Sequence, residues 1–350
     1  MVDWSLARQV ARLAASRGSP TGRVDADLAA MSCEAAVHVE RYTGLEGAAT
    51  APEAELVSRE QWAEINLGSL SELLDPVAAR LDRRLGTAGP LAGALRVATS
   101  ATLAAEVGLV IGYMSQRVLG QFELSLLNPQ APPRLLFVEP NLAGASRTMG
   151  VDSESFLRWV ALHETTHVLQ FSGVDWLREH LGTLLRAYMD TLEVRINRGS
   201  AGGLPAFPDP MRLIADFREG GLVGLIQTRE QRQILNRVQA AMAVVEGYAE
   251  HVMDAVGTDV LPAYVGLREA MDARRSNRSA PERILNRLLG LDQKMRQYEV
   301  GKRFSDAVVE RVGIEGLNRV WESPEMLPTQ TELERPADWI ARVDRDSLAA

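Results

Sequence analysis

The sequence contains a single cysteine, Cys33, among its 350 residues. One cysteine excludes an intramolecular disulfide, and disulfides are what stabilise most small secreted domains. The first eight residues also lack an uninterrupted apolar stretch that ends in a small-residue cleavage site, so we expect no signal peptide. Both absences favour a cytoplasmic location.

An excess of basic residues is missing as well. The formal net charge is −8, whereas nucleic-acid binding normally requires a basic excess or a clustered basic stripe. The arginine-rich run from Asp272 to Arg278 is short and lies among loop-forming residues, which indicates a solvated loop. We therefore predict no nucleic-acid partner.

Long hydrophobic runs are few. The most apolar segment, Val97 to Ser115, contains Glu106 and depends on small alanines and glycines, so we interpret it as a buried core helix and predict no membrane partner. Solenoid-length repeats and low-complexity tracts are also lacking, which argues against a repeat architecture. The apolar fraction of 46% is that of an ordinary globular protein.

Helical periodicity dominates what is present. Apolar residues recur at steps of three and four in the segments 62–85, 91–119, 155–171, 177–195, 230–256 and 284–312. The segment Arg134 to Glu139 is the best strand candidate. We predict a mainly α fold with a small β element. We predict a single domain, residues 1–350, with a division into two lobes near the glycine- and proline-rich stretch 198–210 as the alternative.

The motif His-Glu-x-x-His carries the chemistry. It occupies His163, Glu164 and His167 within an apolar helical pattern. Residues four apart lie about 40° apart around a helix axis, so both imidazoles project from one face and can share a metal ion. Glu164 lies about 100° further round, beside the metal, where a general base acting on water belongs.

Catalytic zinc usually takes a third protein ligand. A metzincin would place a histidine ten residues after the first, but that position is Gly173. We predict Glu246 as the third ligand, because it lies on an apolar helical segment where acidic groups need partners. His180, Asp175, Glu250 and His251 remain alternatives.

The segment around Glu246 contains further candidates. Glu250 lies one turn on and could accept a hydrogen bond from a ligand imidazole, which would fix its tautomer. Tyr248 or His251 could donate to a developing oxyanion. Gly247 would permit a close approach of the two metal-binding helices, and the strand Leu135 to Glu139 could offer an exposed edge to an extended peptide, although its apolar run equally suits a buried strand.

The combination of a His-Glu-x-x-His helix with a later helix bearing Glu246 and Glu250 resembles the gluzincin branch of zinc metallopeptidases. Glu250 stands where an aspartate is usual there, which places its carboxylate one methylene further out. More of the chain resembles the zincin-like metallopeptidase type 2 family, which is associated with biosynthesis of a deazaflavin coenzyme. The similar segments are 118–123, 137–141, 295–301, 316–321, 327–329 and 336–339, together with the two metal helices.

This resemblance implies a zincin-like architecture with the metal site between two core helices, Zn²⁺ as the cofactor and peptidase chemistry. The predicted function is zinc-dependent hydrolysis of a peptide or other amide, with Glu164 as general base. The alternatives are a catalytically silent zinc-containing scaffold or binding protein and, less favoured, a metal-free helical protein. An intact Glu164 favours the enzyme.

Overall fold

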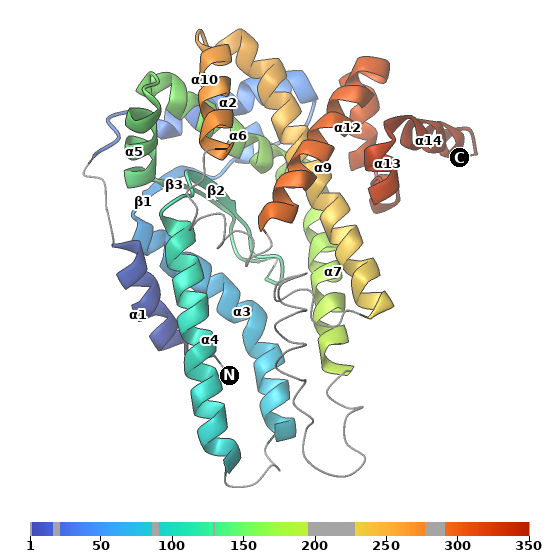
Figure 1. The fold of residues 1–350 in the computed structure, drawn as a ribbon. Coiled ribbons are helices and arrows are strands. Elements are labelled where there is room, and N and C mark those ends of the chain that lie inside the picture. The colour runs from blue at the N-terminus through green and yellow to red at the C-terminus, as the bar shows by residue number, and fades with distance from the viewer. Residues whose placement is uncertain are drawn as a thin grey trace. The chain divides into compact units, whose positions relative to one another are not determined.

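A computed structural model describes residues 2–16, 22–85, 91–128, 130–194, 228–276 and 291–349 (Figure 1). The contacts divide the chain into two compact units. Unit 1 comprises Met1–Ala35 and Ala51–Val168, and unit 2 comprises Ala36–Thr50 and Leu169–Ala350. The fold is mainly helical with a small three-stranded sheet, as predicted. The stretch 198–210, near which we predicted the division into lobes, lies outside the described residues.

The sheet belongs to unit 1 and has the strand order β1, β3, β2. β1 (Ala54–Val57) runs parallel to β3 (Arg134–Val138), and β2 (Gly120–Glu123) runs antiparallel to it, with Phe122 opposite Leu135. Leu135, Leu136, Phe137 and Val138 are all buried. Successive strand residues point to opposite faces, so both faces of β3 are covered.

The strand predicted from Arg134 onward is therefore confirmed. The accompanying idea that Leu135 to Glu139 offers an exposed edge is wrong, because β3 is the central strand with a neighbour on each side and Glu139 begins the next helix. The edge strands of this sheet are β1 and β2.

Three helices of unit 1 pack side by side: α1 (Trp4–Ala15), α3 (Arg59–Leu85) and α4 (Leu91–Ser115) (Figure 1). α5 (Glu139–Met149) follows β3 directly. By the division above, α2 (Leu28–Thr43) and α6 (Ser153–Gly173) begin in unit 1 and end in unit 2. The core joins small residues of α1 and α4 to larger residues of the sheet and α3, namely Ala7, Ala11, Ala104, Trp62, Leu67, Leu136 and Val138.

α4 contains the apolar segment that we predicted to be buried. Ala104 is fully buried, but Leu103 and Leu109 are 41% and 56% exposed, so the helix is only partly covered and that prediction is corrected. Among the described residues no helix is long and apolar enough to cross a membrane.

Unit 2 is helical in its described part. Its main helices are α7 (Asp175–Val194), α9 (Arg229–Val260), α10 (Tyr264–Ser276) and α12 (Leu291–Asn318). The chain then forms 3₁₀ turns at Arg319–Trp321 and Pro324–Met326 and the helices α13 (Gln330–Glu334) and α14 (Pro336–Ala349). A further 3₁₀ turn spans Ala48–Thr50. In its described residues, each segment that we predicted to be helical overlaps one of the long helices, although most boundaries differ by a few residues.

α9 and α12 lie side by side (Figure 1). They approach each other closely at two glycines, Gly247 and Gly301. A Cβ atom on Gly247 would lie 2.1 Å from the carbonyl carbon of Gly301, and one on Gly301 would lie 1.9 Å from the carbonyl oxygen of Ala243. We predicted that Gly247 lets the two metal-binding helices approach. The close contact instead joins α9 to α12, because the atoms nearest to Gly247 all belong to Gly301.

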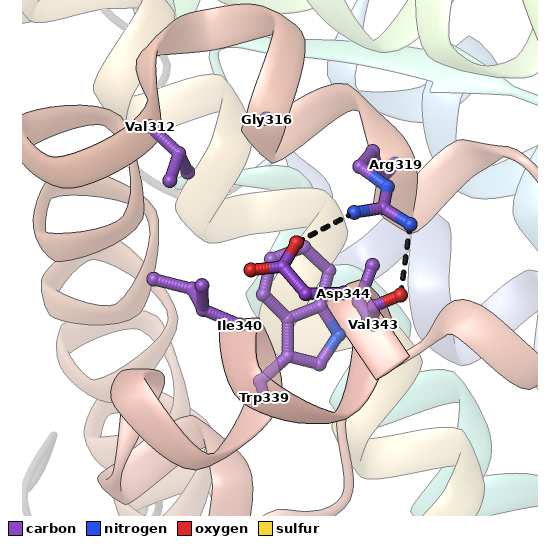
Figure 2. A pocket seen from close by; sticks show the side chains of 7 residues that line it. All are labelled: Val312, Gly316, Arg319, Trp339, Ile340, Val343 and Asp344. Carbon is purple, nitrogen blue, oxygen red and sulfur yellow. Dashed lines mark hydrogen bonds and ion pairs between the residues drawn. The ribbon is translucent and has the colours of Figure 1, made fainter. Parts of the chain in front are cut away.

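A small hollow is lined by residues of α12, α14 and the 3₁₀ turn that follows α12 (Figure 2). Its volume is about 30 Å³, far below the roughly 300–1,000 Å³ of small-molecule sites. Arg319 at its rim donates to Oδ1 of Asp344 at 3.0 Å and to the carbonyl oxygen of Val343 at 2.9 Å. This arginine therefore connects α14 to the 3₁₀ turn that follows α12. The lining residues are Val312, Gly316, Arg319, Trp339, Ile340, Val343 and Asp344.

Candidate metal centre

α6 presents the two histidines of the motif on one face. Asp152 caps the helix start by accepting from the amide of Ser155 at 2.8 Å. One turn apart, His163 and His167 have ring centroids separated by 4.8 Å, and both side chains are half-buried. The indole of Trp159 stacks on His163 with an interplanar angle of 6°. The spacing thus delivers two neighbouring imidazoles, as predicted from the helix period.

Glu164 points from the same helix toward the edge strand β2. Its side chain is buried, with 7% of the residue exposed. The backbone amide of Phe122 donates to Oε2 of Glu164 at 3.1 Å. A hydrogen bond to the charged form of a carboxylate stabilises that form and fixes its orientation. The predicted base is therefore held beside the two histidines rather than lying as a solvated surface charge.

Glu246 lies midway along α9, whose position is fixed within unit 2 by a buried polar contact. The side-chain amide of Gln170, in the last turn of α6, donates to the carbonyl oxygen of Val245 at 2.8 Å. Gln170 is completely buried. A buried amide rarely lacks a partner, so this contact sets the register of the residue that precedes Glu246.

His163, His167 and Glu246 form a group that could hold a metal ion. Each offers one ligand atom, and these atoms all lie within 4.8 Å of one another. Two imidazoles and one carboxylate are a donor set found in catalytic zinc sites. Partial burial of all three side chains also suits a site that a substrate can reach. The residues therefore fit a divalent metal.

Tyr248 and His251 have partners within unit 2. The buried hydroxyl of Tyr248 donates to Oδ1 of Asn318 at 2.7 Å, and burial raises the pKa of this phenol. His251 contacts the hydroxyl of Tyr42 through Nε2 and Oδ1 of Asp306 through Nδ1, each at 2.8 Å. On an ideal helix both residues point more than about 130° away from Glu246. The donor role that we predicted for them stays a prediction.

Glu250 is almost fully buried and its Oε2 lies 2.6 Å from Nη1 of Arg268. Burial alone would lower the pKa of Arg268, but the charges of Glu250 and Asp254 outweigh it and raise that pKa. Lys302 extends this network by pairing with Asp254 at 2.8 Å and with Asp306 at 2.6 Å. A role for Glu250 in orienting a ligand imidazole stays a prediction.

The alternative third ligands His180 and Asp175 both lie on α7. The ring of His180 packs edge-on against Trp176 with centroids 5.7 Å apart, and burial followed by the charge of Arg237 lowers its pKa. Neither residue belongs to the group of described side chains that could share a metal.

Three residues at this site were missed from the sequence: Gly120 and Phe122, which contact Glu164, and Gln170. Gln170 follows Val168 and Leu169 on an apolar helix, and a polar residue at such a position signals a buried hydrogen bond. Gly120 and Phe122 lie in a segment, 118–123, that we noted only for its family resemblance. A backbone donor leaves no mark on the side-chain pattern.

Histidines of a His-Glu-x-x-His helix beside a glutamate from a later helix define a zincin-type metal centre. The profile of the zincin-like metallopeptidases matches residues 2–340, and the chain belongs to this family. It is also similar to a solved structure from Chloroflexus aurantiacus, described as a proposed hydrolase with a novel fold. That comparison has a TM-score of 0.72 and 31% sequence identity over 99% of each chain. No curated protein matches the sequence. The family resemblance is thus confirmed, and the deazaflavin association stays a prediction.

Proposed function

We propose that this protein is a zinc-dependent hydrolase that cleaves a peptide or another amide. His163, His167 and Glu246 would hold the metal, and Glu164 would act as general base. The observation that carries the proposal is the group of three ligand atoms within 4.8 Å of one another, with Glu164 on the same helix as two of them. Membership of a metallopeptidase family and the likeness to a proposed hydrolase support it.

The donor set favours a catalytic over a structural metal. Structural zinc sites are usually closed by four protein ligands, whereas catalytic sites use three and keep one position open. The group in the described residues has three members. When bound, zinc supplies Lewis acidity, which polarises a carbonyl and lowers the pKa of water.

Glu164 would move the proton. Its carboxylate takes a proton from the attacking water and passes it to the leaving nitrogen, which is the work of a general base that becomes a general acid. The Phe122 amide holds Oε2 of Glu164, so the carboxylate is oriented before substrate arrives. Burial of the side chain limits competition from bulk water.

Metal content tests the ligand set. Protein purified without chelator or added metal is analysed by mass spectrometry as wild type, Glu246→Ala and the exposed control Glu269→Ala. We expect about one zinc per chain in the wild type and the control, and a sharp loss in Glu246→Ala. Absence of metal from the wild type would refute the proposal, and undiminished zinc in Glu246→Ala would move the third ligand elsewhere.

Glu164→Gln separates the hydrolase from a silent zinc scaffold. The variant keeps the shape of the side chain but cannot take up a proton, so we expect it to retain zinc and lose about 10²- to 10⁴-fold in cleavage of a peptide-library substrate. The wild type and Glu269→Ala provide the reference rates. No cleavage by the wild type, or equal cleavage by Glu164→Gln, would leave the scaffold as the function.

A further inference from the structure

The carboxylate of Glu164 lies directly against Gly120, the first residue of β2. A Cβ atom on Gly120 would be 2.6 Å from Cγ of Glu164 and 2.9 Å from both Cδ and Oε1. Real Cβ contacts essentially never fall below 3.0 Å. Any side chain at position 120 would therefore displace Glu164 or be displaced by it.

The need for glycine at this position is a need for space. The glycines with positive φ in the described residues are Gly44, Gly47, Gly150 and Gly313, so the backbone of Gly120 is one that alanine can adopt. Alanine would even lose less conformational freedom on folding. The contact with Glu164 is what opposes a side chain here.

β2 cannot easily move aside, because its residues Gln121 and Glu123 are hydrogen-bonded to α3. Gln121 and Asn66 exchange two side-chain hydrogen bonds of 3.1 and 3.3 Å, and Ser69 donates to Glu123 at 2.8 Å. The loop entering β2 is fixed as well. Buried Asn141 donates to the carbonyl oxygen of Val118 at 2.6 Å. A side chain at position 120 would therefore displace mainly the Glu164 side chain.

We propose that Gly120 is a positioning residue for Glu164. The space left by its missing side chain and the hydrogen bond from the Phe122 amide together fix the orientation of the Glu164 carboxylate. This inference rests on the proposed function, in which Glu164 is the base. It gives a functional role to the first residue of β2, a role that the His-Glu-x-x-His motif on α6 does not predict. A general base must be placed to within a fraction of an ångström. A side chain at position 120 would therefore lower the rate of turnover even if all proposed metal ligands stayed in place.

A double-mutant cycle on the metal-free protein tests the contact. Unfolding by urea is measured for the wild type, Gly120→Ala, Glu164→Ala and the double variant. We expect Gly120→Ala to lower the folding equilibrium constant by about tenfold or more in the wild-type background and to have little effect once Glu164 is truncated. Gly68→Ala adds the same methyl group to α3 in open space, and its effect should be equal in both backgrounds.

The cycle stays informative if Gly120→Ala does not fold. Recovery of folding in the double variant would then support the contact, and failure of both variants would overturn the proposal. Equal losses from Gly120→Ala with and without the Glu164 side chain would also overturn it.

The positioning role is read from the Co²⁺-loaded protein. We expect Gly120→Ala to bind Co²⁺ and to shift the visible absorption toward that of Glu164→Gln, while Gly68→Ala leaves it unchanged. If the Co²⁺ absorption spectrum of Gly120→Ala equals that of the wild type, Gly120 contributes to packing alone and the proposal is overturned. Failure of the wild type to bind Co²⁺ would instead count against the proposed function, whatever the unfolding cycle shows.

Discussion

Gln170 on α6 donates a 2.8 Å hydrogen bond to the backbone carbonyl of Val245, the residue that precedes Glu246 on α9. Gln170 follows His167 by three residues, about 4.5 Å along the helix axis. One buried amide therefore connects the histidine-bearing helix to the backbone that carries Glu246, the proposed third ligand. We therefore expect the placement of the proposed ligand Glu246 to depend on Gln170, which is not itself one of the proposed ligands.

Removing that amide should weaken metal binding without removing a ligand. We expect Gln170→Ala to lower zinc affinity about 10- to 100-fold, the usual effect of losing a residue that orients ligands. Competition with a chromogenic chelator measures it, with the exposed Gln233→Ala on α9 as control. Unchanged zinc affinity in Gln170→Ala would show that the hydrogen bond serves packing alone.

The buried pair of Glu250 and Arg268 should matter for stability. Glu250→Ala removes the closest carboxylate of Arg268, whose side chain is only 18% exposed, but leaves Asp254 at 3.2 Å. We therefore expect a loss of about 1–3 kcal/mol in the free energy of unfolding. Urea denaturation provides the measurement. The exposed pair of Glu34 and Arg158 is the comparison, because Glu34→Ala should cost less than about 1 kcal/mol.

A smaller loss in Glu250→Ala than in Glu34→Ala would contradict this account. Zinc titration of the same Glu250→Ala protein tests the orienting role predicted from the sequence. Retained affinity would assign Glu250 to the ion-pair network alone.

Asp306 should make the free energy of unfolding decrease at acid pH. Burial would raise the pKa of Asp306, but hydrogen bonds from His251 and Lys302 outweigh it and hold the pKa below its usual value. A carboxyl with a lowered folded-state pKa contributes stability that is fully present above its unfolded pKa of about 3.9 and is lost as pH falls through the folded value. We expect Asp306→Asn to be less stable than the wild type at neutral pH, with a gap that closes as pH falls below about 4.

Urea midpoints from pH 7 to pH 3 measure this gap. The exposed Asp338→Asn serves as control and should follow the wild type. Curves of wild type and Asp306→Asn that stay parallel down to pH 3 would exclude the predicted linkage.

The glycine contact between α9 and α12 should tolerate no side chain. Gly301→Ala places a methyl group 1.9 Å from the carbonyl oxygen of Ala243, so the helices must separate, and we expect a loss of about 3 kcal/mol or more. Gly266→Ala on α10 points into open space and should be neutral or stabilising by up to about 1 kcal/mol. Thermal and urea unfolding compare the two, and similar stability would argue against the close packing.

The features that depend on helical periodicity could be predicted from the sequence. The helical spacing of apolar residues predicted α6 and α9, and the motif spacing predicted two adjacent imidazoles, because both depend only on the 3.6-residue turn. Glu246 was recognisable as an acidic residue on an apolar helix. These are local properties, and local geometry follows directly from the chain.

Contacts between residues that are distant in the sequence could not be predicted. Nothing in the sequence around Gly247 names α12 rather than α6 as the neighbour, and β2 is too short and too mixed in polarity to show a strand period. The amide that holds Glu164 belongs to the backbone of Phe122, so no side-chain pattern encodes it. Such contacts depend on which elements the complete fold brings together.

The boundaries of the two units have a consequence for dissecting the protein. The chain passes from one unit to the other three times, after Ala35, Thr50 and Val168, so neither unit is a continuous stretch of sequence. A fragment that begins at Leu169 would lack Tyr42 and Thr43, which contact His251 and Asn318 in unit 2. The fragment 169–350 should therefore be incompletely folded on its own and should gain helical structure, measured by circular dichroism, when it is mixed with the fragment 1–168, which contains both residues.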